Sequence, residues 1–270
     1  RRQRQMCIRD SYYTGLFPFG DGSSNNLSYT VALSRNNTFT NPIFPLGGSE
    51  FVLSARFSLP YSLWNGVDYA NLGDLEKFQD DDGNPDPAKI EQEKFKWLEF
   101  YKIKFKGSWY TRLFDKLVLR THTEFGFLGA FNNDRGVIPF DRFFLGGDGM
   151  SQYAMDGRET ISLRGYPNQS LSSQDGSTIY NRFSLELRYP ITLKPAASIF
   201  GLTFMETGQG YNNFREFNPF NGKRSVGLGL RIFMPAFGLL GIDFGYGLDS
   251  VNEFNLEPNG WETHFVIGQQ

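Results

Sequence analysis

The feature that most constrains this chain is a repeated alternation of apolar with polar or small side chains, in segments of about ten residues. In one such segment Leu240, Ile242, Phe244 and Tyr246 alternate with glycines and Asp243. A period of two is that of a β-strand whose two faces differ. We therefore expect about nine strands, within residues 27–35, 51–59, 101–106, 117–127, 182–189, 199–208, 226–234, 240–247 and 263–270.

The composition supports an all-β chain and excludes several other classes. The 270 residues include 28 Phe, 13 Tyr, 4 Trp and 30 Gly, and this richness in aromatic residues and glycine is typical of β proteins. The net charge of −2 provides no attraction to nucleic acid, so no nucleic-acid partner is expected. The single Cys7 cannot form an internal disulfide, and no Cys/His group has metal-ligand spacing.

Two architectures fit the alternation: a soluble sandwich or barrel, and a membrane barrel whose polar face lines a wet lumen. Connections 190–196 and 235–238 are short, whereas 60–96, 130–180, 210–222 and 249–261 are long. Short turns on one side and long loops on the other are typical of outer-membrane barrels. Ionic side chains within the strands, and Trp109, Tyr189 and Trp261 near strand ends, favour the same architecture. We predict an antiparallel transmembrane β-barrel located in the bacterial outer membrane, with lipid as a partner.

No motif predicts an enzyme. His122 and His264 have no nucleophile elbow or identifiable acid partner, so we interpret them as lumen-lining residues and expect no catalytic residue. The acidic run 80–82 lacks the ligand pattern of a calcium loop, and the glycine cluster 146–149 lacks the lysine of a phosphate loop. We expect neither metal nor cofactor.

The long loop 130–180 is the most informative segment, because loops of this length are usually functional or disordered and this one is too aromatic for disorder. If it folds back into the lumen, Arg164 needs carboxylate partners. Glu186 and Glu206 are the nearest candidates in chain order, which predicts an ionic lock between loop and barrel. In segment 199–208 the large apolar residues share parity with Glu206, which indicates either a bulge or apolar side chains that point inward.

Several ordered motifs carry a resemblance to a known family. They are F-F-L-G-G at 143–147, R-G-Y at 164–166, S-L-E-L-R-Y-P at 184–190, E-T-G at 206–208, G-L-G-L-R at 227–231 and F-V-I-G-Q-Q at 265–270. In this order they resemble the C-terminal half of the barrel in the BamA family of outer-membrane barrel assembly proteins. Relatives of that family include two-partner secretion pores and other surface-antigen barrels.

The resemblance implies a barrel of sixteen strands, of which this chain supplies about the last nine. It assigns residues 11–270 to the C-terminal part of the barrel domain and leaves 1–10 as a fragment edge. The family's periplasmic POTRA domains are missing, and the chain stops at Gln270 instead of a terminal aromatic residue, so we expect truncation at both ends. The loop motif comprises Leu163, Gly165 and Tyr166 beside Arg164. The terminal strand and seam comprise Phe265, Ile267 and Gly268.

The resemblance implies a non-enzymatic factor that folds and inserts β-barrel proteins into the outer membrane. Its partners would be unfolded barrel clients and the lipoproteins of an assembly complex. Physically, a weakly paired seam exposes an edge strand that can template an incoming strand, and the short last strand between Gly260 and Gly268 is expected to pair weakly. The alternative is a translocation pore of the two-partner secretion type. An enzyme or a passive porin has the least support.

Overall fold

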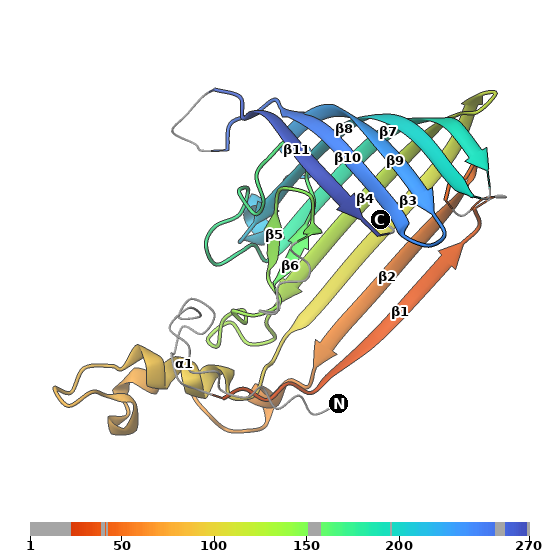
Figure 1. Ribbon diagram of the computed structural model, residues 1–270. Helices are drawn as coiled ribbons and strands as arrows, with labels where there is room; N and C mark the ends of the chain where they lie inside the picture. The colour runs from red at the N-terminus through yellow and green to blue at the C-terminus, as the bar shows by residue number, and fades with distance from the viewer. Residues whose placement is uncertain are drawn as a thin grey trace. The chain divides into compact units, whose positions relative to one another are not determined.

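The computed structural model describes residues 23–38, 41, 43–150, 158–194, 196–251 and 257–268. Its main element is one nine-stranded antiparallel sheet with the strand order β1-β2-β3-β4-β7-β8-β9-β10-β11 (Figure 1). A separate parallel pair consists of β5 and β6. The strands are β1 (Ser28–Asn36), β2 (Gly48–Ser58), β3 (Tyr101–Phe114), β4 (Leu117–Gly129), β5 (Phe143–Leu145), β6 (Glu159–Ile161), β7 (Ile179–Lys194), β8 (Ala197–Tyr211), β9 (Lys223–Met234), β10 (Gly238–Gly247) and β11 (Gly260–Ile267).

All nine segments with period-two alternation are strands of the main sheet, which confirms the predicted fold class. Most strands extend a few residues beyond the expected ranges, and three differences are informative. β3 continues to Phe114, β11 begins at Gly260, and β7 runs through Pro190, where the pairing with β8 shifts register before Thr192. Proline has no N–H to donate to the ladder, so the strand continues across it with an irregularity and does not end there.

The chain divides into two compact units. Among the described residues, the first contains 23–31, 55–103 and 127–142, and the second contains 32–54, 104–126 and 143–268. The first unit includes most of the long connection between β2 and β3, and the second includes all of β7 to β11.

The β2–β3 connection holds the helical elements that the alternation did not predict. They are α1 (Pro87–Phe95), η1 (Tyr61–Leu63), η2 (Leu72–Asp74) and η3 (Glu76–Phe78), and a further short helix, η5 (Phe214–Glu216), follows β8. α1 begins at Asp86, whose carboxylate accepts hydrogen bonds from the N–H groups of Ala88 and Lys89 at 2.9 and 3.3 Å. Proline at the first helical position completes this N-terminus. Among the described residues, no helix has the length and apolar character needed to cross a membrane.

Strands β7 to β11 bury their charged face and expose their apolar face. Leu228 and Phe244 are 57% and 46% exposed, whereas the neighbouring Arg231 and Asp243 are 4% and 0% exposed. A water-soluble sheet has the opposite distribution, and a strand that meets lipid has this one. We call the buried side the polar face, defined by Arg182, Glu186, Glu206, Arg231, Asp243 and His264.

Strand β8 is the exception on the polar face. Phe200, Leu202 and Phe204 are buried on the same side as Glu206, and the pairing of β8 with β9 runs without a shift from Ser198 to Gly208. Of the two alternatives, the inward-pointing apolar side chains are therefore correct. These side chains form an aromatic cluster, defined as Phe44, Tyr110, Val118, Phe200, Leu202 and Phe204.

Candidate functional site

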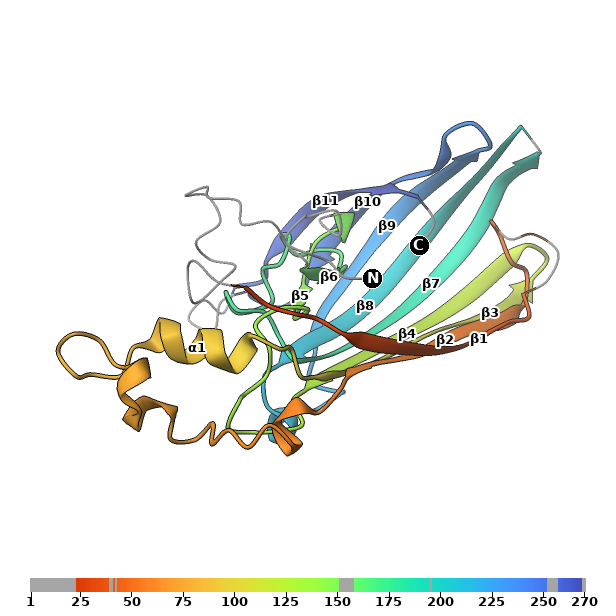
Figure 2. The same cartoon turned by 90° about the horizontal axis from the view of Figure 1, so that it is seen from below.

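The β4–β7 connection returns to the polar face of the sheet. Its short strand β5 lies beside β8, and Phe143 packs its ring 4.6 Å from that of Tyr180 at the start of β7 (Figures 1 and 2). Leu163 pairs with Gly147 through two backbone hydrogen bonds of 3.1 Å. We call the segment Leu163–Tyr166 the loop tip. The motif at 143–147 therefore supports the loop tip.

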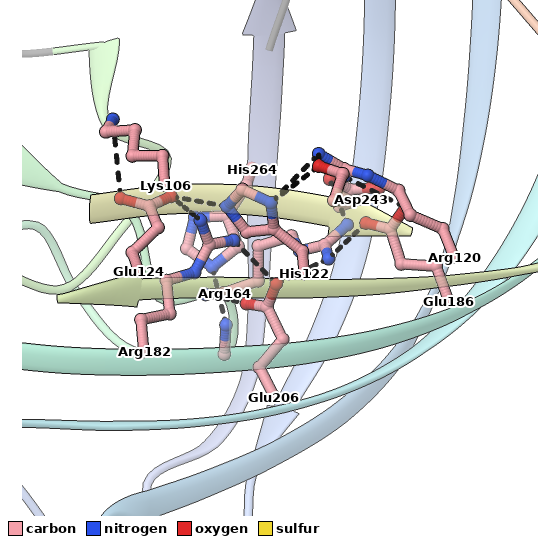
Figure 3. A network of polar contacts seen from close by, with 12 residues as sticks. Lys106, Arg120, His122, Glu124, Arg164, Arg182, Glu186, Glu206, Asp243 and His264 are labelled. Atoms are coloured by element: carbon pink, nitrogen blue, oxygen red, sulfur yellow. Dashed lines mark hydrogen bonds and ion pairs between the residues drawn. The ribbon is translucent and has the colours of Figure 1, made fainter. Parts of the chain in front are cut away.

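Arg164 extends from the loop tip into a group of carboxylates on the polar face (Figure 3). Its Nη2 lies 2.7 Å from Glu186 Oε1 and 2.5 Å from Glu206 Oε1, and its backbone N–H donates to Glu206 Oε2 at 3.0 Å. The guanidinium also lies over the Phe204 ring, 3.7 Å from its centroid. The structure therefore brings together the three residues that the sequence singled out.

A third carboxylate at this site was missed. Asp243 Oδ2 lies 3.4 Å from Arg164 Nη1, and both oxygens of Asp243 accept hydrogen bonds of 2.7 Å from Arg231. The alternation did place Arg231 and Asp243 on the polar face. Their position opposite Arg164 depends on the register of β9 and β10 and on the path of the loop, which the alternation does not show.

Each buried carboxylate is shared by more than one cation. Glu206 also accepts from Arg182 at 2.7 Å, and Glu186 also accepts from Arg188 at 2.8 Å. Isolated buried charges are strongly disfavoured, so this sharing is what allows them to remain ionised on the polar face. Nearby Glu206, Glu186 and Asp243 raise the pKa of Arg164 further above its usual value, although burial acts in the opposite direction.

The backbone of the loop tip is bound to the end of β10 and to β11. The Gly165 N–H donates to His264 Nε2, and Asn259 donates to the Gly165 carbonyl, both at 2.9 Å. A side chain on Gly245 would place its Cβ 2.6 Å from the Gly165 nitrogen, and one on Gly247 would place it 2.5 Å from the Gly165 oxygen. Glycine at both positions therefore allows the loop tip to lie directly on β10.

Tyr166 completes the docking of the loop tip. Its hydroxyl donates to the Arg224 carbonyl oxygen at 2.6 Å and accepts from the Asp249 N–H at 3.3 Å. The side chain is fully buried, and burial raises the pKa of Tyr166 to about 12.

With this geometry described, the chain can be compared with known proteins. The model of the Omp85 superfamily domain matches residues 10–270. The chain belongs to the Omp85 superfamily. The nine-stranded sheet with its buried charged face agrees with this assignment.

One solved structure shows how much of an Omp85 barrel is present. The crystal structure of BamA from Haemophilus ducreyi lacking POTRA domains 1–3 superposes with a TM-score of 0.56 and 19% sequence identity. The similarity covers 88% of this chain and 41% of that one, so this chain spans about two fifths of the BamA structure. The likeness establishes the Omp85 fold. Among curated proteins, none matches the sequence significantly.

His122 lies in a second charged group of this Omp85 barrel, and its side chain is buried beside other charged side chains of β4. The acid partner that the sequence could not identify is Glu124, whose Oε1 lies 2.7 Å from His122 Nε2 because alternate residues of β4 share a face. Ser108 lies 2.9 Å from the other ring nitrogen. Ser108, His122 and Glu124 do not form a nucleophilic site, because Ser108 is buried and its hydroxyl oxygen accepts a hydrogen bond from Arg120. Within the described ranges, no His, Cys, Asp or Glu side chains are grouped to hold a metal ion.

Strand β11 contains the seam residues that the sequence singled out. Phe265 and Ile267 expose their side chains on the apolar face. β11 is paired with β10 over its whole length, from Gly260 to Ile267, and the Gly268 N–H donates to the Leu239 oxygen at 2.8 Å. The expected weak pairing is therefore not on the β10 side. In the described sheet β11 is the last strand of the order, and β10 is its neighbour on one side.

Gln269 and Gln270 lie outside the described residues, as do 1–22, which include the proposed fragment edge.

Proposed function

We propose that this barrel is an outer-membrane assembly factor, which receives unfolded β-barrel proteins and helps them fold into the membrane. The observation that carries the proposal is the edge of β11. Within the described sheet β11 is the last strand of the order and pairs with β10 on one side. A terminal strand that is weakly paired on its other side can pair with an incoming strand. In hydrocarbon an unpaired backbone group costs several kcal/mol, so a seam that opens beside β11 would favour the addition of a client strand.

The side chains of β11 suit this role. Phe265 and Ile267 continue the apolar face toward lipid, while His264 and Val266 are buried on the polar face. An added strand with the same alternation would continue both faces. Membrane β-strands have this alternation, so the edge would select the class of client and would not depend on its detailed sequence.

The loop tip would act as a brace for this edge. Arg164 binds Glu186 on β7, Glu206 on β8 and Asp243 on β10, while Gly165 binds His264 on β11. One loop thereby contacts four strands, and it would hold the edge in a fixed register while a client pairs. The proposed chemistry is non-enzymatic and uses the folding free energy of the client.

A translocation pore of the two-partner secretion type is the alternative. A polypeptide passing along the polar face would have to displace the loop tip and its buried ion pairs. Removing one partner of such a pair typically costs about 3–5 kcal/mol. This cost favours assembly over secretion as the activity of the structure described.

Photo-crosslinking in the full-length protein, in growing cells, tests the proposal. A photoreactive phenylalanine analogue replaces Phe265 on β11 or, as a control, Phe244 on β10, which has partner strands on both sides. The two side chains are 58% and 46% exposed, so accessibility is matched. We expect crosslinks to newly made outer-membrane barrels from position 265 and few from 244. Crosslinks to a secreted polypeptide, or equal yields at both positions, would contradict assembly at this edge.

The cellular consequence is measured by depletion. Lowering the level of the full-length protein should reduce the heat-modifiable, folded forms of outer-membrane barrels. Export of secreted proteins should fall later. Loss of one exported protein with normal barrel levels would identify the translocation pore. Periplasmic lipoproteins that co-purify with the full-length protein would be its partners in an assembly complex.

A further inference from the structure

The β2–β3 connection contains a pocket that barrel assembly does not use. It has a volume of about 270 Å³, close to the lower end of the roughly 300–1,000 Å³ range typical of small-molecule sites. All of its lining residues belong to the first compact unit. Its walls are aromatic and come from Tyr61, Trp64, Tyr69 and Trp97.

A buried ion pair fixes Arg135, one of the residues that line the pocket. Arg135 Nη1 lies 2.6 Å from Glu99 Oε2, and both side chains are almost fully buried. Glu99 also accepts hydrogen bonds from the N–H and hydroxyl of Ser62 at 2.8 and 2.7 Å. Arg135 donates further to the Trp97 carbonyl oxygen at 2.5 Å and lies over the Tyr69 ring at 4.9 Å. Three separate chain segments are thereby joined around one cavity before any ligand binds.

Two of the aromatic side chains that line the pocket remain accessible to solvent. Trp64 and Trp97 are 62% and 44% exposed, and the Tyr61 ring lies 5.3 Å from that of Trp97. Exposed indole faces are unfavourable in water, and here two of them border a hollow instead of packing into a core. They provide flat apolar surfaces on which a ring can stack.

Polar groups without partners also belong to the residues that line the pocket. The Tyr61 hydroxyl is buried and has no hydrogen-bond partner. Within the described part of the chain, no hydrogen bond or ion pair involves the side chains of Glu93 and Lys96, which also line the pocket. A buried polar group without a partner is unfavourable, so a ligand hydroxyl that reaches the Tyr61 hydroxyl would be favoured. The pocket thus offers a hydroxyl, an acceptor and a donor beside stacking surfaces.

We propose that this pocket binds one sugar ring of a glycan outside the cell. A pyranose has an apolar face of C–H groups, which stacks on indole, and a rim of hydroxyls, which both donate and accept. A quaternary ammonium ligand also binds aromatic walls, but Lys96 and Arg135 would repel it. A phosphate ligand would meet Glu93. Mixed donors and acceptors beside aromatic faces fit hydroxyls better than either ion.

The topology supports a ligand outside the cell. The β2–β3 connection is one of the long connections of the chain, whereas the turns at 115–116 and 235–237 are short. In outer-membrane barrels the long loops are extracellular. The proposal is independent of whether the barrel assembles or exports proteins, since it concerns a separate part of the chain.

Binding is tested with the full-length protein in an amine-oxide detergent, because detergents with sugar head groups would compete. An array of neutral and acidic oligosaccharides identifies a bound glycan, whose affinity is then measured by calorimetry. The array tests lipopolysaccharide sugars and free extracellular oligosaccharides separately. This separation shows from which of the two the bound sugar comes. Tetramethylammonium and inorganic phosphate are titrated in parallel.

We expect Trp97→Ala and Trp64→Ala each to weaken glycan binding about tenfold or more, which corresponds to losing one stacked ring. Glu93→Gln should weaken it less. Trp109→Ala is the matched control, because Trp109 is 44% exposed like Trp97 but lies on β3 outside the pocket. The affinity of this variant for the glycan should equal that of the wild type. Absence of glycan binding by the folded protein, equal affinity in all variants, or saturable binding of either ion instead of sugars would overturn the proposal.

Discussion

The backbone N–H of Gly165 donates a hydrogen bond of 2.9 Å to Nε2 of His264, and both groups are buried. The loop tip is thereby joined to the last strand of the described sheet, 99 residues further along the chain. A backbone N–H can donate only to a nitrogen that carries no proton, so His264 is neutral with its hydrogen on Nδ1. The edge strand and the loop tip should therefore respond to each other's mutations.

We expect His264→Ala to loosen the loop tip, because it leaves the Gly165 N–H buried without an acceptor. Such a loss costs about 1–3 kcal/mol. Hydrogen–deuterium exchange of 163–166 in the full-length protein should become faster. His264→Gln, which retains an acceptor at a similar reach, should exchange at nearly the wild-type rate. Unchanged exchange in the alanine variant would show that this bond does not hold the loop tip.

Arg164→Ala should make the segment 163–173 more sensitive to protease in the folded, full-length protein. Three carboxylates would lose their shared cation, and breaking a buried pair typically costs about 3–5 kcal/mol. Arg164→Lys should also be impaired because an ammonium cannot match the fork of donors. Arg215→Ala, at an exposed arginine on η5, is the control. Equal cleavage of all variants and of Glu186→Gln would rule out the ionic lock.

Gly245→Ala should displace the loop tip without unfolding the barrel. The new Cβ would lie 2.6 Å from the Gly165 nitrogen, so either the loop tip or β10 must move. Gly201→Ala on β8 is a matched control, since the new Cβ would lie 4.0 Å from the Gly229 oxygen, which is an ordinary contact distance. The folding activity on denatured clients in vesicles should fall for the first variant alone. Comparable activity of the two would mean that close contact between loop tip and β10 is dispensable.

Leu228→Arg should destabilise the barrel by roughly 2–4 kcal/mol, because this exposed position lies in the middle of β9 and faces lipid. Met234→Arg, on the same face at the end of the strand, should cost roughly 0–1 kcal/mol. The free energy of unfolding in lipid vesicles, followed by tryptophan fluorescence in urea, measures both. A similar cost at the two positions would contradict the assigned depth of β9.

The raised pKa of Tyr166 leads us to expect a lower free energy of unfolding at high pH. Its pKa is raised from 10 to about 12, so the stabilisation is complete below pH 10 and is lost as pH rises through 12. In this interval the unfolded chain ionises Tyr166 while the folded protein keeps it neutral. We expect wild type to lose roughly 2–3 kcal/mol more than Tyr166→Phe between pH 9 and pH 12. Identical pH profiles in urea unfolding would show that Tyr166 is not buried as described.

The sequence predicts the strands well because each strand is a local pattern. It also identifies Arg164, Glu186 and Glu206, since a buried arginine requires acids and the two glutamates lie in the next two strands along the chain. Asp243 and His264 could not be assigned to the loop tip in this way. Their proximity to it depends on where the loop crosses the sheet, which no local pattern specifies.

Two misses had local signals of their own. The pair Asp86 and Pro87 is an N-terminal signal for a helix, but α1 lies in a long polar connection where alternation is absent. Pro190 suggests the end of a strand, and β7 continues because the register shifts around the missing donor. Asp86 and Pro87 therefore marked an element that the alternation did not show, whereas Pro190 marked a strand end that is only an irregularity in the pairing.

The aromatic cluster has a consequence for the permeability of the cell envelope. Phe44 and Phe200 meet edge to face at 5.2 Å on the polar face, where a diffusion channel would contain water. A hydrated ion crossing there would have to shed its water among phenyl rings, at a high energetic cost. Reconstituted in a planar bilayer, the barrel should therefore conduct little current. Bacteria that carry it in their outer membrane would gain almost no additional leak of dyes, detergents or antibiotics.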